Sequence, residues 1–347
     1  MVVLRMIASR RTEPGAEENP TFPQSDYCFA AIWFGISVLA AALTLAAHFF
    51  PLSPTLAIFF LALPTLSLMF SAQRNALGAQ LSEITSGRAF DLRILAFALL
   101  FILPITYLGS RQIIYFDTAY YHLQMALILQ EFGTIRGLAN LFTNFGQSST
   151  WFALAAPGTV GGEWSWGSSL ANVFISLVAG VHGAFALGRL AGGSSRLCDY
   201  IPGIGFPLVL FFAARWGMIA STSPDLAVML LSVTVAWCLC LPRDIRSAYF
   251  ALPVGAFAVT VKLSAIPLFT IACIAVIVSW RRDSGKALIA SATAIAILLP
   301  FMSLSVSASG CLAVPVAWTC FDLPWTPSAA RLDSQADLII SAARGAE

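Results

Sequence analysis

Long, continuous apolar runs constrain this chain more than any other feature of its sequence. A helix crosses a bilayer core about 30 Å thick with roughly 20 apolar residues, and the runs here approach that length. They are continuous, unlike the alternating segments of about ten residues in an outer-membrane barrel. Hydrophobic residues make up 58% of the 347 residues and charged residues only 10%, too few charges to cover a water-soluble domain of this size. The sequence therefore predicts an all-α, polytopic transmembrane helix bundle.

The apolar runs divide the chain into a bundle and two tails. Residues 1–26 lack the apolar core of a signal peptide and are expected to form a cytoplasmic tail. The bundle covers residues 27–307 and includes a long loop with amphipathic helices at 110–166, and residues 308–347 form a C-terminal tail. The nine predicted spans are Tyr27–Phe50, Leu52–Ala72, Ile94–Gly109, Gly167–Leu187, Ile201–Ala214, Leu226–Leu241, Ala248–Val261, Leu263–Trp280 and Ala287–Ser307.

Positive charges between the spans predict the orientation, because cytoplasmic loops retain Lys and Arg. With the N-terminus inside, thirteen of the 19 basic residues fall on the cytoplasmic side and six on the other. The N-terminus is therefore predicted to be cytoplasmic and the C-terminus extracytoplasmic. On this reading, the long loop and the short loops that carry Arg215, Asp225 and Lys262 share the extracytoplasmic face.

The long loop contains the first candidate site residues. Its pattern predicts an amphipathic helix from Thr118 to Phe132, with Asp117 or Thr118 as N-cap and Gly133 as the end. Asp117 is open to two interpretations: a helix cap at the membrane surface, or a general base or cation ligand. A carboxylate beside a low-dielectric surface has a raised pKa unless it is paired, which favours acceptance of a proton from a hydroxyl.

His122 follows Asp117 by five residues, which in an α-helix places it about 140° round the axis. It is interpreted either as a polar-face residue or as a catalytic neighbour of Asp117 that contacts substrate or phosphate. Tyr121 and Arg136 of the same loop are candidate substrate-binding residues.

Three residues of later loops are further substrate-binding candidates. Asp225 follows a Ser-Thr-Ser-Pro sequence that is also typical of a helix N-cap. Lys262 stands between two apolar stretches, as a lysine does when it reaches toward headgroups, and Arg215 has the same ambiguity. Together, cations can neutralise a phosphate while a carboxylate activates a nucleophile.

Other classes of site have less support. The basic residues are dispersed, which argues against a nucleic-acid partner. No metal site is predicted from the cysteines, and the cofactor remains unknown, with a divalent cation at Asp117 left open. Cys311 and Cys320 lie in the C-terminal tail, where an oxidising compartment would permit a disulfide between them.

The loop also carries a family resemblance. YFDTAYYHLQ, GTIRGLANL and NFGQSSTWF, with the later SPDLAVMLL, VTVKLSAIPL and SGCLAVPVAW, resemble poorly characterised bacterial membrane proteins related to the GT-C superfamily of membrane glycosyltransferases. The resemblance covers roughly residues 113–325 and implies a bacterial inner-membrane enzyme with a polyprenyl-phosphate-linked sugar donor. It implies that Asp117 is catalytic, with His122 beside it.

The leading hypothesis is thus a glycosyltransferase-like enzyme that acts at the extracytoplasmic face, with membrane lipid, the lipid-linked donor and a glycan or glycolipid acceptor as partners. The alternatives are a transporter or lipid-glycan flippase and a noncatalytic membrane subunit. A transporter requires ionisable residues near the bilayer midplane. The sequence places His48 and His182 near helix ends, which favours chemistry at the membrane surface.

Overall fold

The computed structural model of the chain describes residues 24–56, 58–59, 62, 75, 78, 92–112, 114–159, 169–241, 246–281 and 283–345. Their regular secondary structure is helical, and extended backbone pairs within these residues only at one isolated bridge between Cys311 and Cys320. The predicted all-α class is therefore confirmed for the described part of the chain.

The helices follow the predicted apolar runs in order. The longer ones are α2 (Gln24–Ala46), α5 (Leu92–Gly109), α9 (Leu170–Ala191), α10 (Tyr200–Arg215), α11 (Pro224–Cys240), α12 (Arg246–Val261), α13 (Ile266–Ser279), α14 (Ser284–Ser309) and α15 (Ala329–Arg344). The shorter ones are the π turn η1 (Thr118–His122), α6 (Leu123–Phe132), α7 (Leu138–Leu141), α8 (Thr150–Ala155) and the 3-10 turns η2 (Thr143–Gly146), η3 (Ala156–Gly158), η5 (Leu197–Asp199), η6 (Met218–Ala220), η7 (Leu263–Ala265) and η8 (Ala317–Thr319).

Five helices are long and apolar enough to cross a membrane. They are Ser25–Ala46, Leu92–Gly109, Leu170–Ala191, Leu197–Arg215 and Ser284–Ser309. The apolar helices α11, α12 and α13 coincide with three more predicted spans but are shorter than the 18 residues that the others reach. The predicted span Leu52–Ala72 lies largely outside the described residues. The chain is thus a helical protein with five candidate membrane-spanning helices in the part that the structure describes.

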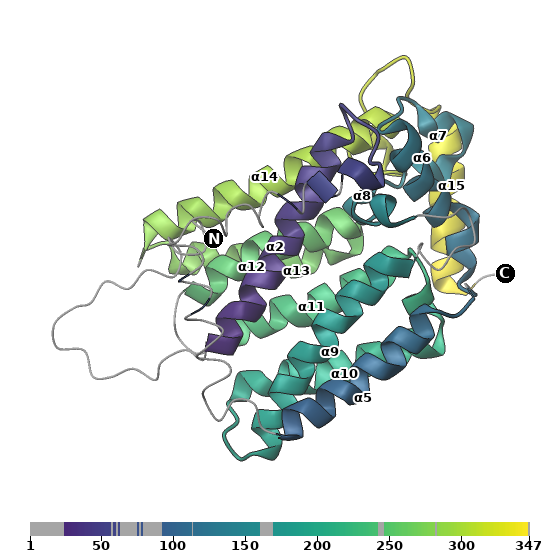
Figure 1. Ribbon diagram of the computed structural model, residues 1–347. Helices are drawn as coiled ribbons and strands as arrows, with labels where there is room; N and C mark the ends of the chain where they lie inside the picture. Colours follow the sequence, from purple (N-terminus) through teal and green to yellow (C-terminus); the bar gives the residue numbers. More distant parts are fainter. Residues whose placement is uncertain are drawn as a thin grey trace.

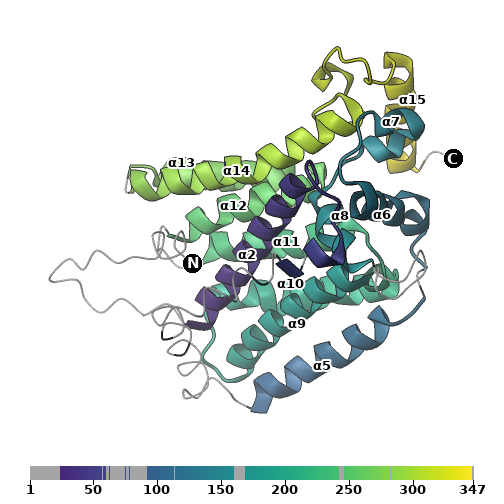
Figure 2. The same ribbon diagram turned by 45° about the horizontal axis from the view of Figure 1, so that its top comes forward.

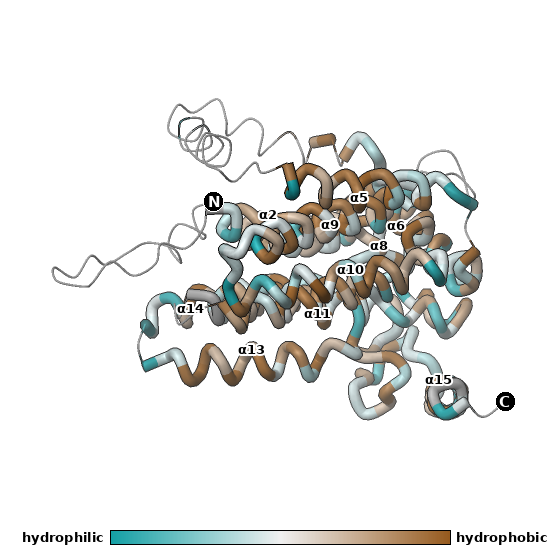
Figure 3. Tube along the Cα trace, turned by 90° about the horizontal axis from the view of Figure 1, so that it is seen from below, coloured by the Kyte–Doolittle hydropathy of each residue, from teal (hydrophilic) through white to brown (hydrophobic). Residues whose placement is uncertain are grey.

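The bundle has two unlike ends. Figure 1 shows the long helices side by side, with α6, α7, α8 and α15 gathered at one end, which we call the loop end. Figure 3 shows the same helices as mostly hydrophobic along their length, with many of the hydrophilic residues near their ends. Three helices, α5, α10 and α12, have their C-termini at the loop end, and α11 has its N-terminus there. The turns that follow α5, α10 and α12 therefore meet at this end.

Close packing of α5 on α9 depends on glycine. A Cβ atom on Gly188 would lie 2.3 Å from Cγ1 of Ile94, and one on Gly180 would lie 2.8 Å from Cβ of Phe101. Small residues of this kind let two helix backbones approach, as is common between helices in membranes. Figure 2 shows α5 on the outer side of the bundle beside α9.

An ion network holds the opposite end of the bundle. Arg189 Nη2 lies 2.6 Å from Asp199 Oδ1 and 3.3 Å from Asp26 Oδ1, and Arg196 Nη2 lies 2.5 Å from Asp26 Oδ2. Both carboxylates are fully buried, so each requires these partners. The network joins α2 to the end of α9 and the start of α10.

His182 lies inside the bundle, which corrects its predicted place near a helix end. Trp33 Nε1 donates a hydrogen bond of 3.3 Å to His182 Nδ1, and the Phe29 ring stacks on the imidazole at 4.1 Å. The imidazole is fully buried. Helix length explains the difference, because α9 continues to Ala191, beyond the predicted end at Leu187.

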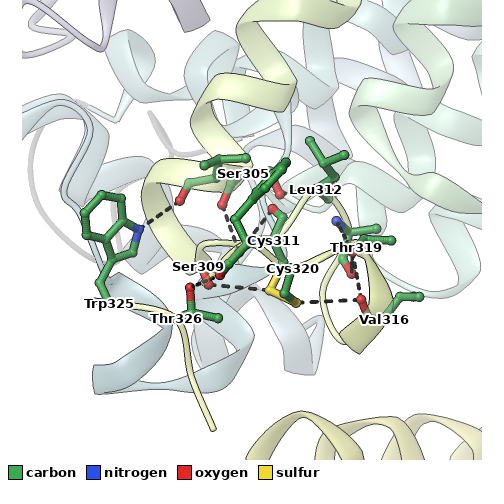
Figure 4. Close-up of a disulfide and its surroundings, with 12 residues drawn as sticks. Ser305, Ser309, Cys311, Leu312, Val316, Thr319, Cys320, Trp325 and Thr326 are labelled. Atoms are coloured by element: carbon green, nitrogen blue, oxygen red, sulfur yellow. Dashed lines mark hydrogen bonds between the residues drawn. A yellow bond between two sulfur atoms is a disulfide. The ribbon is translucent and has the colours of Figure 1, made fainter. Parts of the chain in front are cut away.

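The C-terminal segment, which the sequence predicts only as a tail, contains a disulfide-closed loop and a helix. Cys311 and Cys320 form a disulfide just after α14, and η8 lies within the loop that it closes. Leu332 of α15 belongs to the same small apolar cluster as the two cysteines. Figure 4 shows the disulfide beside the end of α14, with Trp325 on the other side of that helix end.

Candidate functional site

The stretch that carries Asp117 begins with a π turn. The N–H group of Leu123 donates to the carbonyl of Thr118, an i→i+5 bond, and α6 continues from there to Gly133, whose φ is 69°. The predicted helix over 118–132 and its end at Gly133 are confirmed. The predicted cap by Asp117 is wrong, because Asp117 has right-handed helical backbone angles and its side chain makes no capping bond.

The π turn changes which side chains face the same way. In an i→i+5 register, residues five apart are about one turn apart, whereas in an α-helix they are separated by about 140°. The angle between Asp117 and His122 round the helix axis is therefore smaller than the value of about 140° expected for an α-helix. Single π turns of this kind are frequent at functional sites.

Asp225 is the centre of a polar cluster at the loop end. Its Oδ2 atom accepts hydrogen bonds of 2.9 Å from Tyr115 Oη and of 2.9 Å from Ser223 Oγ. Its Oδ1 atom forms an ion pair with Lys262 Nζ. These three donors favour the ionised carboxylate of Asp225.

Local sequence explains how Asp225 is presented. Ser223 is the N-cap of α11 and accepts a 3.1 Å bond from the Asp225 N–H group, while Pro224 occupies the first helical position. The sequence interpretation of this segment as a helix cap is confirmed. Because the cap fixes the first turn of α11, it also points the Asp225 carboxylate toward Tyr115 and Lys262.

Asn172 of α9 fixes the backbone that precedes α11. Its Nδ2 atom donates to the carbonyls of Met218 at 2.8 Å and Ser223 at 3.1 Å, and its Oδ1 atom accepts a 2.8 Å bond from Trp151 Nε1. Asn172 and Trp151 are fully buried. The position of Asp225 is thus set from within the bundle.

The backbone beside Lys262 is fixed from α8. Ser149 Oγ donates to the carbonyl of Val261 at 2.7 Å, and the hydroxyls of Thr150 and Thr260 are 2.8 Å apart. Lys262 itself is exposed and lies between α12 and η7. Its ammonium group therefore reaches Asp225 from a rigid base while it stays open to solvent or lipid headgroups.

Asp117 lies within the electrostatic reach of this pair but is not bonded to it. Partial burial and then the charge of Asp225 raise the pKa of Asp117, while Lys262 acts in the opposite direction. Within the described residues, the Asp117 carboxylate accepts no hydrogen bond and forms no ion pair. One carboxylate is thus paired and the other is available. We call Tyr115, Asp117, Tyr121, His122, Asp225 and Lys262 the Asp225 cluster.

His122 is buried, so the first of its two interpretations, a residue of the polar face, is wrong. It is 1% exposed, and its ring contacts those of Tyr121 at 4.2 Å, Phe152 at 5.5 Å and Tyr115 at 6.4 Å between centroids. Burial lowers the pKa of His122 to about 3, so it is neutral at pH 7. His122 is packed in the interior beside the site, and its ring contact positions Tyr121.

The buried, neutral imidazole of His122 should make the folded protein less stable in acid. The pKa of His122 is about 3 in the folded chain and 6.5 when exposed. The unfolded chain therefore binds more protons in this interval, and the stability present above pH 6.5 is lost as the pH falls, by about 1.4 kcal/mol per pH unit. His122→Phe should lose less stability between pH 6.5 and 4.5 in thermal unfolding. An unchanged pH slope, equal to that of Tyr121→Phe, would contradict the burial of a neutral imidazole.

Comparison with known proteins places the chain in a family. A family model described as a domain of unknown function (DUF8201) matches residues 16–347. The chain belongs to this DUF8201 family. No curated protein and no solved structure matches it. The matched residues include both the Asp225 cluster and the C-terminal segment.

Two predicted site residues of this DUF8201 chain lie outside the cluster. The Arg136 guanidinium lies over the Trp325 ring at 5.6 Å, on the C-terminal segment. Arg215 is exposed at the end of α10, and among the described residues no hydrogen bond or ion pair joins it to Asp225 or Asp117. Glu163, also in the long loop, lies outside the described residues.

A divalent cation here would have Asp117 and Asp225 as its ligands. The described residues contain no group of three His, Cys, Asp or Glu side chains that could hold a metal ion. The two carboxylates alone are therefore a poor fit to a resident divalent ion.

Proposed function

We propose that this chain is a glycosyltransferase-like enzyme of the bacterial inner membrane that acts at the extracytoplasmic face. It would transfer a sugar from a polyprenyl-phosphate-linked donor to a glycan or glycolipid during assembly of a surface polysaccharide or glycolipid. The observation that carries the proposal is an available carboxylate, Asp117, beside the exposed ammonium of an ion pair, Lys262, at one end of an apolar bundle.

Each member of the Asp225 cluster has a part in the proposed reaction. Asp117 accepts the proton of the acceptor hydroxyl, whose oxygen then forms a bond to the anomeric carbon. The bond from that carbon to the phosphate oxygen breaks, and polyprenyl phosphate leaves with the electron pair. Lys262 stabilises the charge on the phosphate, while Asp225, held by Tyr115, keeps the ammonium in place.

Tyr121 and His122 contribute to the proposed reaction less directly. Tyr121 lines the site, and its place is set by His122. Arg136 and Arg215, which were predicted as substrate-binding residues, have no part in this step because they lie outside the cluster.

The cysteines support the predicted orientation. The Cys311–Cys320 disulfide lies at the loop end, and disulfides persist in oxidising compartments. Two of the free cysteines, Cys198 and Cys240, belong to η5 and to the last turn of α11, both at the opposite end. Together with the excess of Lys and Arg on the predicted cytoplasmic side, this favours nine spans with the N-terminus inside and the Asp225 cluster outside.

His182 is the one observation that favours a transporter, because an ionisable residue inside a membrane bundle is often functional. Its neighbours, however, are the rings of Phe29, Phe206 and Trp237, with Trp33 as hydrogen-bond donor. Among the described residues, these packed aromatic rings form a core around His182, so the enzyme remains the better proposal.

Binding of the donor lipid tests the function without knowledge of the sugar. The purified protein in lipid nanodiscs should bind polyprenyl phosphate at least about tenfold more tightly than the uncharged polyprenol, because Lys262 contacts only the phosphate. Native mass spectrometry with the two lipids in competition measures this ratio. Equal affinities, or no binding of either lipid, would contradict the proposal.

A further inference from the structure

The C-terminal segment is hydrogen-bonded to the second half of the long loop. Arg331 donates to Thr143 Oγ1 through Nε at 3.1 Å and to the Asn140 carbonyl through Nη1 at 2.8 Å. Two more contacts flank this one: Asn140 Nδ2 donates to the Trp325 carbonyl at 2.6 Å, and Gln335 Nε2 donates to Asn144 Oδ1 at 2.7 Å. The segment α7–η2 is thus bonded directly to α15 and to the loop before it.

Further hydrogen bonds attach both segments to the end of α14 in the bundle. Trp325 Nε1 donates to the carbonyl of Val306 at 3.0 Å, and the Gly137 N–H group donates to the carbonyl of Ser307 at 2.9 Å. Both carbonyls belong to the last turn of α14. The Cys311–Cys320 disulfide closes the loop that follows α14, and Leu332 packs against it. The end of α14 therefore supports α15 and α7 together.

An aromatic row connects α7–η2 to the Asp225 cluster. Phe142 meets Tyr120 edge to face at 5.2 Å, and Phe145 meets Phe142 in the same way at 5.2 Å. Tyr120 stacks on Phe116 at 5.5 Å. Phe116 immediately precedes Asp117, and Tyr120 lies inside the π turn that follows it. The row therefore borders Asp117 on both sides in sequence.

We propose that residues 310–345 act as a clamp that holds α7–η2 and, through the aromatic row, positions the π turn and with it Asp117. Arg331 of the clamp and Phe142 of the row are the positioning residues. Two local weaknesses require such support. α7 has only four residues, far fewer than an isolated helix needs in water. A π turn is likewise a rare form of the helix that persists where its surroundings impose it. The catalytic importance of the position of Asp117 rests on the proposed function, whereas the contacts of the clamp do not depend on it.

Amide hydrogen exchange of the full chain in lipid nanodiscs tests the clamp without any activity assay. In Arg331→Ala and in Phe142→Ala, peptides from 138–146 and from 116–126 should exchange about tenfold faster than in the wild type. Phe142→Tyr, which keeps the ring, should restore wild-type exchange at 116–126. Arg344→Ala, at the far end of α15, is the matched control, and peptides of α9 should be unchanged in every variant.

Two results would overturn the proposal. In one, faster exchange stays within 325–345 and 138–146 and does not reach 116–126. In the other, Phe142→Tyr exchanges as fast as Phe142→Ala, so that the ring contact has no part in positioning. Absence of sugar transfer by the wild-type chain, with the expected exchange pattern intact in the variants, would count against the proposed function and leave the clamp standing.

Discussion

Asp117→Asn should abolish sugar transfer while the protein is made and folds as before. A positioned general base contributes about 10²- to 10⁴-fold to a rate, and an amide cannot accept the proton of the acceptor hydroxyl. Asn has nearly the same shape, and Asp117 makes no hydrogen bond or ion pair within the described residues that it would lose. Release of polyprenyl phosphate from a labelled donor, with purified protein in nanodiscs, measures the effect.

The stability of this variant has a predicted sign. The pKa of Asp117 is raised in the folded chain by burial and by Asp225, so its ionisation weakens folding as the pH rises through that pKa. A neutral Asn lacks this loss, and Asp117→Asn should be at least as stable as the wild type at pH 7. Glu131→Gln, an exposed acid of the same helix, is the matched control and should keep full activity. Activity retained in Asp117→Asn would end the catalytic assignment.

Lys262→Met should weaken the binding of polyprenyl phosphate by about 10- to 100-fold, with little effect on polyprenol. A hydrogen bond to a charged group is worth about 1.5–3 kcal/mol, and each 1.4 kcal/mol is a factor of ten in affinity. The methionine keeps most of the apolar stem. The Ser223 hydroxyl and the Tyr115 hydroxyl still bind Asp225 in this variant, which limits the damage to the fold.

The chain offers a matched control for Lys262. Lys286 forms an ion pair with Asp283 at 2.9 Å at the opposite end of the bundle. Lys286→Met removes one lysine and one ion pair but should leave the affinity for polyprenyl phosphate unchanged. Lys262→Arg keeps the charge and should retain most of the binding. Equal loss in Lys262→Met and Lys286→Met would mean that general charge, and not this site, attracts the lipid.

The sequence predicted the all-α class and the apolar helices of the described residues because their signal is local. Each apolar run needs no partner to be recognised, and the end of α6 at Gly133 and the start of α11 at Ser223 follow from single residues with strong local preferences. Helix alternation, in turn, placed Asp117, Asp225 and Lys262 at one end of the bundle before any contact was known.

Local sequence patterns do not predict the contacts within the Asp225 cluster. Tyr115 and Asp225 are 110 positions apart, and the sequence alone does not pair them. The π turn has no residue signature, so the side of the helix occupied by His122 was misjudged. Asn172 had one signal, a lone amide in an apolar run, which often marks a buried hydrogen bond between helices.

The C-terminal segment shows the same limit. Residues 331–347 read as a polar tail, and no local pattern in the sequence indicates that Arg331 would reach Asn140, 191 positions away. Only the paired cysteines pointed to an ordered structure there.

The central claim is that the Asp225 cluster holds the phosphate of a lipid-linked donor, and the position of that phosphate tests it most directly. In a structure of the protein in nanodiscs with bound polyprenyl phosphate, we expect a phosphate oxygen within hydrogen-bond distance of Lys262 Nζ and the lipid chain along the outside of the bundle. A phosphate bound at Arg189 and Arg196 at the opposite end, or none near Lys262, would contradict it.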